Sequence, residues 1–145
     1  MKKNILFIII ATLTTLKISA QTTTAESLKG KAYKIVFQLT SNDTLVQKAM
    51  VQQIKNVLTA SPKTKIEVVC HSNGITFLQT NITQQTSQVK ELTARGVVFA
   101  ACENTIRERK IDKKDILREA VFVPVGALEV TDKELSGWAY LKAGF

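Results

Sequence analysis

The stretch "VVFAACENTIRER" (residues 97–109) joins a strand pattern to a helix pattern with no turn between them. Its first six residues form a short apolar run that predicts a buried strand ending at Cys102. The polar residues that follow favour a helix that begins at once. This arrangement is typical of α/β proteins, because parallel strands are joined by helical crossovers.

The same alternation runs through the rest of the chain. Apolar runs rich in β-branched residues predict three further strands, at residues 33–40, 65–70 and 120–126. Helical patterns lie at 41–62 with Asn42 or Asp43 as cap, at 83–96, at 103–119 with a break near Ile111, and from Thr131 to a short extended end. Residues 71–81 predict a loop with a short helical turn. The 145 residues leave room for one domain, in which helices cover both faces of a parallel sheet.

The first twenty residues have the layout of a secretory signal peptide. Lys2 and Lys3 precede the apolar run "ILFIIIATLTTL", and the sequence ahead of Gln21 predicts cleavage after Ala20. The apolar run is short for a bilayer span, although an uncleaved N-terminal anchor is the alternative. We expect a periplasmic or secreted protein without stable membrane insertion after cleavage. A flexible polar leader at residues 21–31 would then precede a folded domain at 32–145.

The charge pattern argues against nucleic acid as a partner. The formal charge falls from +8 to +5 in the mature chain, because Lys2, Lys3 and Lys17 are removed without any acidic residue. The densest basic run, "RERKIDKKDILRE" (107–119), contains interleaved acids and no aromatic residue. Such a run is typical of a solvated helical face.

Both cysteines stand at the predicted carboxyl ends of strands, where open parallel sheets bind their ligands. Cys70 leads into a loop with His71 and Gly74, and Cys102 leads into a helix. A helix N-terminus lowers the pKa of a thiol, which makes Cys102 a candidate reactive thiolate. The alternative is a thiol that packs like alanine in the core. If the two strands are neighbours, the thiols could approach each other.

Other site chemistries find little support. His71 is the only histidine, and it does not complete a zinc-ligand spacing with two distant cysteines, so no metal is expected. No glycine-rich phosphate loop or G-x-S-x-G elbow is present, and no cofactor is expected. His71 is either a general base or a loop residue that only hydrogen-bonds its surroundings.

The sequence around Cys102 resembles the DsrE/DsrF-like proteins, a family that includes sulfur-relay subunits. Residues 94–105, "ARGVVFAACENT", match an Ala-x-Gly-Val-x-Phe-x-x-Cys-x-Asn-Thr pattern. The stretches "YKIVFQLTSND", "KIEVVCHSNGITFL" and "VFVPVGALEVTDKELSGWAYLKAGF" resemble the first strand, the second strand with its turn, and the closing part. The resemblance covers residues 33–145.

This resemblance implies a three-layer α/β/α fold with a parallel sheet of about five strands, and assembly into a homo-oligomer, a trimer or a hexamer. It also implies that Cys102 carries sulfur as a persulfide, as in the relay members. Those members are typically cytoplasmic, whereas this chain has a signal segment. Cys70 stands where a small apolar residue is expected, and a disulfide between Cys70 and Cys102 would block persulfide chemistry until reduced.

The leading hypothesis is therefore an exported sulfur carrier or transferase that binds or transfers sulfane sulfur through Cys102. Its partners would be a thiol-bearing sulfur donor or acceptor. We expect Asn104 and Thr105 around the sulfur, with His71, Gly74 and Cys70 on the facing side. The alternative is a non-catalytic oligomeric module that binds a small ligand or partner and whose cysteines are structural. A disulfide-exchanging couple comes last, because the chain has no C-x-x-C motif.

Overall fold

Five parallel strands form the centre of the structure, a computed structural model that describes residues 25–144. The strand order is β4-β3-β2-β1-β5, and every neighbouring pair is parallel. The expected parallel sheet of about five strands is confirmed. The strands are β1 (Lys34–Leu39), β2 (Lys65–Cys70), β3 (Val98–Cys102), β4 (Ala120–Val123) and β5 (Ala139–Lys142).

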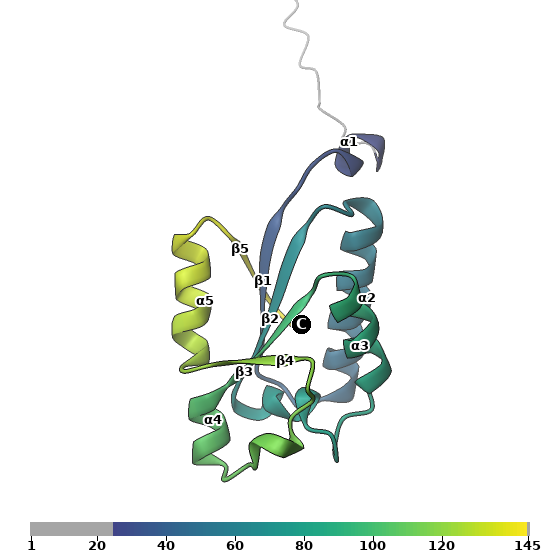
Figure 1. Cartoon of the computed structure of the whole chain (residues 1–145). Helices are drawn as coiled ribbons and strands as arrows, with labels where there is room; N and C mark the ends of the chain where they lie inside the picture. The colour runs from purple at the N-terminus through teal and green to yellow at the C-terminus, as the bar shows by residue number, and fades with distance from the viewer. Residues whose placement is uncertain (1–24, 145) are drawn as a thin grey trace, which may run out of the picture.

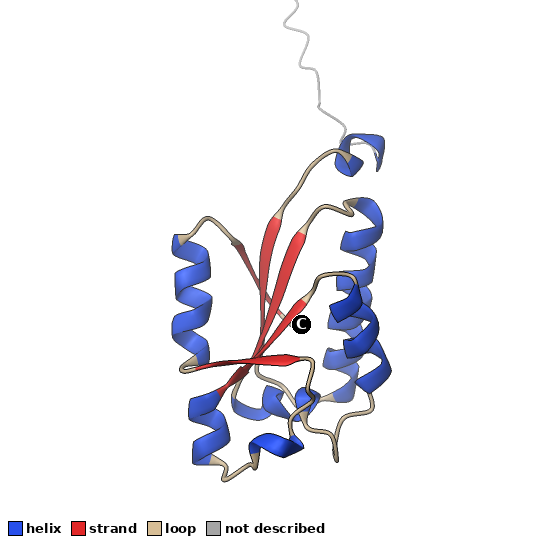
Figure 2. Ribbon diagram, viewed as in Figure 1, coloured by secondary structure: helices blue, strands red, loops and turns tan. Residues whose placement is uncertain are grey.

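Helices cover both faces of this sheet, as Figure 1 and Figure 2 show. α2 and α3 pack on one face over the larger core, and α5 packs on the opposite face over a smaller apolar cluster. The helices are α1 (Ala25–Lys29), α2 (Thr44–Ala60), α3 (Thr86–Ala94), α4 (Glu103–Glu108) and α5 (Gly126–Leu135), with 3₁₀ turns η1 (Ser72–Leu78) and η2 (Lys113–Asp115).

Local sequence explains where the long helices begin and end. The Asp43 carboxylate accepts a hydrogen bond of 2.8 Å from the Leu45 N–H and caps α2. Gly96 follows α3 with a φ of 88°, a left-handed conformation that favours glycine and ends the helix. These two termini were predicted. The parallel pairing of β2 with β3 brings the carboxyl ends of both strands to the same edge of the sheet.

Two helix predictions need correction in their extent. The run 103–119 is broken near Ile111, as predicted, but its helical parts are only the short α4 and the turn η2, and Lys110 lies between them with a left-handed φ of 55°. The last helix begins at Gly126 rather than near Thr131, because β4 already ends before Pro124. The extended end that was expected after this helix is β5, which pairs with β1.

The N-terminal predictions lie mostly outside this description. The predicted signal peptide (residues 1–20) is outside the described residues. Within the predicted leader (21–31), the structure describes residues 25–31, which contain the one-turn helix α1. Among the residues that the structure describes, no helix is long and apolar enough to cross a membrane.

Candidate functional site

Cys102 is the last residue of β3, and its sulfur accepts hydrogen bonds from two other segments. The Thr105 N–H in α4 donates to Sγ over 3.5 Å, and the Gly126 N–H at the start of α5 donates over 3.2 Å. These segments meet because β3 and β4 are neighbours, and each runs at its carboxyl end into a helix. The N-termini of α4 and α5 therefore converge on one sulfur atom.

These contacts hold the pKa of the Cys102 thiol below its ordinary value of 9.0. Burial raises the pKa, but hydrogen bonds outweigh it: they come from the Thr105 side chain and from the N–H groups of Thr105, Gly126 and Asn104. Such donors favour the thiolate, the nucleophilic form of cysteine. The sequence prediction that a helix N-terminus lowers this pKa has its structural basis here, and α5 contributes as well as α4.

The sulfur lies just below the surface of the single chain. Cys102 is only 3% exposed. Pro124 and Val125 form the loop from β4 to α5 beside it, and both are exposed. A reactant thus reaches the sulfur only if it is small or if this loop moves.

Cys70 belongs to the other face of the sheet. Its partner across the β2–β3 pair is Ala101, so Cys102 stands one residue further along and points to the opposite side. Cys70 is fully buried in the core under α2 and α3, where desolvation raises its thiol pKa far above the ordinary value. Both cysteines are free. The idea that the two thiols approach each other and form a disulfide was therefore wrong, and Cys70 takes no part in the Cys102 site.

His71 lies beside the site with both ring nitrogens engaged. Its Nε2 is 2.9 Å from the Gln38 amide nitrogen, and its Nδ1 is 3.1 Å from the Ser72 hydroxyl. The Tyr140 hydroxyl donates to Gln38 Oε1 over 2.6 Å, which orients the amide so that its N–H donates to Nε2. Burial lowers the pKa of His71 below 6.5, so the ring is neutral at pH 7. Nε2 of His71 already accepts a hydrogen bond from the Gln38 amide. The geometry therefore favours His71 as a positioning residue rather than as a general base for Cys102.

The other predicted residues divide into a direct and an indirect group. Thr105 contacts the sulfur, and its hydroxyl also accepts from the N–H of Ser72, a residue with a left-handed φ of 52°. The Asn104 N–H donates to the Pro124 carbonyl over 3.1 Å, while its side chain hydrogen-bonds Glu108 and Arg107 along α4. Asn104 therefore ties α4 to the loop before α5 and contributes to the lowered pKa of Cys102 only through its backbone N–H, while its side chain is engaged along α4.

Gly74 has a purely structural reason to be glycine. A Cβ at this position would stand 2.0 Å from the carbonyl oxygen of Leu39, at the end of β1. The close approach packs η1 against the carboxyl end of β1 and so holds the loop that carries His71.

Sequence reasoning missed Gly126 and Gln38. A Cβ at Gly126 would stand 3.1 Å from the Cβ of His71 and 3.3 Å from that of Cys102, so glycine lets α5 approach both residues. No side-chain pattern marks Gly126 as a site residue, because it acts through its backbone N–H. Gln38 gave a weak signal, as a polar residue inside the apolar run of β1. Within the described part of the chain, no cluster of three or more metal-ligating side chains exists.

The third strand of this parallel sheet ends in a thiol that is hydrogen-bonded at a helix N-terminus. These features define a class of small α/β proteins with a cysteine at the carboxyl edge of the sheet. Residues 33–143 match the model of the DsrE/DsrF-like family, and the chain belongs to that family. The match includes every residue of the Cys102 site.

Solved structures agree with this assignment. A protein of unknown function, MTH1491 from Methanobacterium thermoautotrophicum, is 30% identical, with a TM-score of 0.73 over 76% of this chain and 98% of that one. A second protein of unknown function, BT1422 from Bacteroides thetaiotaomicron, is 15% identical and shares the fold, with a TM-score of 0.53 over 75% of this chain and 93% of that one. A search of curated proteins gave no match.

Proposed function

We propose that this protein carries sulfane sulfur on Cys102 as a persulfide. The observation that carries the proposal is the pair of backbone hydrogen bonds to Sγ, from Thr105 and Gly126, which favours the thiolate. Membership of the DsrE/DsrF-like family supports it, because the resemblance implies that Cys102 stands where the sulfur-relay members carry sulfur.

The transfer would occur in two displacement steps. The Cys102 thiolate attacks the terminal sulfur of a donor R–S–SH, which forms a Cys102 persulfide and releases the thiolate R–S⁻. A thiolate acceptor R′–S⁻ then attacks the outer sulfur of the Cys102 persulfide, which forms R′–S–SH and regenerates the Cys102 thiolate. No external oxidant or reductant is needed, because the sulfane sulfur moves between thiols. The same N–H donors would stabilise the Cys102 thiolate when it leaves in the second step.

The single cysteine at the site makes this proposal testable by mass. The wild-type protein, treated with a small persulfide donor and then freed of it, is expected to gain one sulfur atom on the peptide that contains Cys102. Cys102→Ser should gain none, and Cys70→Ala is the matched control that should load like the wild type. Loading of Cys102→Ser would place the sulfur on another residue and contradict the proposal. No loading of a folded wild type would favour the alternative of a binding module with a structural thiol, which the 3% exposure of Cys102 suits.

We also propose that the protein acts as an exported homo-oligomer, a trimer or a hexamer. Exposed apolar side chains on and around α5 support an interface there: Val125, Leu128 and Leu135, the last 82% exposed. Sedimentation of the mature chain at micromolar concentration tests the assembly, and a monomer would contradict it. Cell fractionation with N-terminal sequencing tests export and cleavage after Ala20.

A further inference from the structure

Tyr140 is connected to the His71 ring from the edge of the sheet. It lies on β5, and its hydroxyl donates to Gln38 Oε1 on β1 over 2.6 Å. That bond turns the amide nitrogen of Gln38 toward Nε2 of His71, 2.9 Å away. Tyr140 pairs with Val36, a member of the apolar cluster under α5, so these contacts begin on the face of the sheet that carries Cys102.

The contact with Gln38 selects one tautomer of the His71 ring. A ring nitrogen that accepts a hydrogen bond carries no proton, so the proton of the neutral ring is on Nδ1. Nδ1 lies 3.1 Å from the hydroxyl oxygen of Ser72 and donates to it. The position of the ring proton is therefore decided by an amide that Tyr140 orients.

Ser72 connects the ring to the helix that contacts the sulfur. Its φ of 52° is left-handed, a strained conformation for a residue other than glycine that persists only when its surroundings hold it. Two hydrogen bonds do so: its hydroxyl accepts from His71, and its N–H donates to the Thr105 hydroxyl over 3.1 Å. The Thr105 hydroxyl keeps its own proton for the hydrogen bond to the Cys102 thiol.

These hydrogen bonds all run in one direction. From Tyr140 to Thr105, each group donates toward Cys102, and aligned donors polarise one another so that a negative charge at the end is stabilised. The His71 ring also adjoins Gly126, whose N–H donates to the sulfur: a Cβ built at Gly126 would stand 3.3 Å from the ring carbon Cδ2. The ring thus adjoins both segments that donate to Sγ.

We propose that Tyr140 is a positioning residue for the reaction of Cys102. Through the Gln38 amide it fixes His71 in the Nδ1–H tautomer, and the ring then fixes Ser72, the strained residue after it. The inference rests on the proposed function of Cys102 as the sulfur carrier, and it gives β5 a part in that site. We call Tyr140, Gln38, His71, Ser72 and Thr105 the Tyr140 network.

Two measurements on Tyr140→Phe test this proposal. His71 is the only histidine, so proton–nitrogen NMR spectra of the ring report its tautomer without ambiguity. The wild type should show Nδ1–H, whereas Tyr140→Phe leaves the Gln38 amide free to rotate and should show Nε2–H as well. The pKa of Cys102, measured from the pH profile of its alkylation by iodoacetamide, should rise by about half a unit, which lowers the thiolate fraction about threefold.

A second substitution tests whether Tyr140 acts through Gln38. Gln38→Leu removes the donor to Nε2 and should raise the pKa of Cys102 at least as much as Tyr140→Phe does. The double variant Tyr140→Phe/Gln38→Leu should then match Gln38→Leu alone, because the hydroxyl has no other route to the sulfur. A Tyr140 hydroxyl that only stabilised the fold would change the free energy of unfolding and leave the tautomer unchanged.

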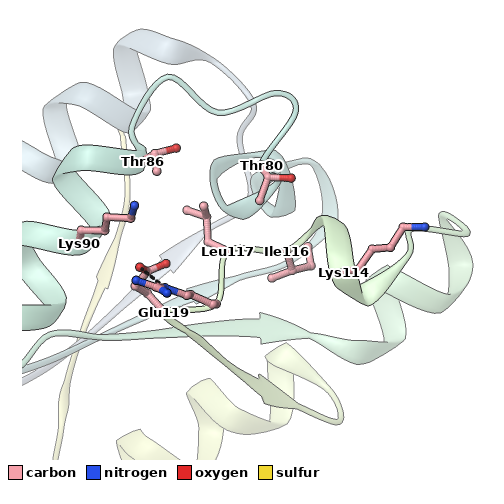
Figure 3. A pocket seen from close by; sticks show the side chains of 8 residues that line it. Thr80, Thr86, Lys90, Lys114, Ile116, Leu117 and Glu119 are labelled. Carbon is pink, nitrogen blue, oxygen red and sulfur yellow. Dashed lines mark hydrogen bonds and ion pairs between the residues drawn. The ribbon is translucent and has the colours of Figure 1, made fainter.

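Two controls remove a hydroxyl outside the Tyr140 network. Tyr33 is the only other tyrosine, and its hydroxyl hydrogen-bonds none of the described residues. Thr86 lines a hollow of about 350 Å³ between the start of α3 and the segment that leads into β4 (Figure 3). In the described part of the chain, no residue that lines this hollow hydrogen-bonds a member of the network. Tyr33→Phe and Thr86→Val should both leave the tautomer and the Cys102 pKa as in the wild type.

Three results would overturn the proposal. They are an Nε2–H tautomer in the wild type, an unchanged Cys102 pKa in Tyr140→Phe, and additive changes in the double variant. Neither measurement uses a sulfur donor, so a wild type that shows the expected tautomer and pKa changes but gains no sulfur would contradict only the proposed function. A protein that gains sulfur on Cys102 but keeps its pKa in Tyr140→Phe would contradict only this inference.

Discussion

The N–H of Gly126 donates a hydrogen bond to the sulfur of Cys102 over 3.2 Å, and this bond joins the first turn of α5 to the end of β3. It brings together two residues that lie 24 positions apart in the sequence. The contact is possible because β4 places the start of α5 beside the carboxyl end of β3. The reactivity of the thiol thus depends on a helix that follows a different strand.

Gly126→Ala should therefore raise the pKa of Cys102 toward its ordinary value. The new Cβ would stand 3.1 Å from His71 Cβ and 3.3 Å from Cys102 Cβ, so α5 must shift and lengthen the bond to Sγ. Such crowding costs about 1–3 kcal/mol of unfolding free energy. The ultraviolet absorbance of the thiolate, followed against pH, measures the pKa.

Gly30→Ala is the matched control, because a Cβ at that position would meet nothing within 4 Å. It should leave the thiolate titration unchanged. An unchanged titration in Gly126→Ala as well would show that the α5 N–H does not set the Cys102 pKa.

The two cysteines should have opposite effects on how stability depends on pH. The folded-state pKa of Cys102 lies below 9.0, so its contribution to stability is present above pH 9.0 and is lost as the pH falls through the folded-state pKa. The folded-state pKa of Cys70 lies far above 9.0, so its contribution is complete below pH 9.0 and decreases as the pH rises further.

Urea unfolding at a series of neutral to alkaline pH values checks both signs. Relative to the wild type, Cys102→Ala should lose more stability as the pH rises toward 9.0, and Cys70→Ala should lose less as the pH rises beyond it. If the free energy of unfolding varied with pH in the same way for the wild type and both variants, this assignment of the two pKa shifts would be contradicted.

How far the sequence predicts this site depends on the register in which β2 pairs with β3. The ends of β2 and β3 follow from apolar runs bounded by polar residues, so both cysteines were correctly placed at the carboxyl edge. Which face each thiol occupies depends on the pairing of Cys70 with Ala101, and a shift of one residue would reverse it. The sequence contains no local signal for that pairing.

The start of α5 was missed for a related reason. Residues 120–126 form one apolar run, and strand propensity alone extends it through Gly126. Pro124 interrupts the run, because it has no N–H to donate to a ladder. The Gly126 N–H is a site donor only through backbone geometry, which no side-chain pattern reveals.

Thr105→Val should weaken the site and the fold together. The Thr105 hydroxyl lowers the pKa of Cys102 and accepts from the N–H of Ser72 over 3.1 Å. Its loss should raise the thiol pKa and cost about 1–3 kcal/mol, because the Ser72 N–H loses its acceptor. Thiolate titration and chemical denaturation measure the two effects.

Thr59→Val is the matched control for that substitution. Its hydroxyl donates to the Lys55 carbonyl within α2, on the exposed surface. It should leave the Cys102 pKa unchanged. If Thr105→Val behaves in the same way, the Thr105 hydroxyl has no part in stabilising the thiolate.

Lys133→Met tests what holds α5 to the sheet at the end remote from Cys102. The Lys133 ammonium group lies 2.5 Å from the Glu67 carboxylate, whose side chain is 5% exposed, and 4.8 Å from the centre of the Trp138 ring. Removal of the lysine leaves a buried carboxylate without its counter-ion, at a cost of about 3–5 kcal/mol. Fluorescence of Trp138, the only tryptophan, reports the unfolding.

The loss of stability in Lys133→Met should depend on pH, and the pKa of Glu67 decides its direction. Burial already raises the pKa of Glu67 above 4.5, and loss of Lys133 should raise it further. Because the folded-state pKa of Glu67 is raised, its contribution to stability is complete below pH 4.5 and is lost as the pH rises through that pKa. The Lys133→Met variant should therefore be least stable relative to the wild type near neutral pH. The double variant Glu67→Leu/Lys133→Met should recover most of the loss, because no charge is then buried alone. A loss that is the same at acid and neutral pH, or that persists in the double variant, would mean that Lys133 supports α5 through packing on Trp138 and not through the ion pair.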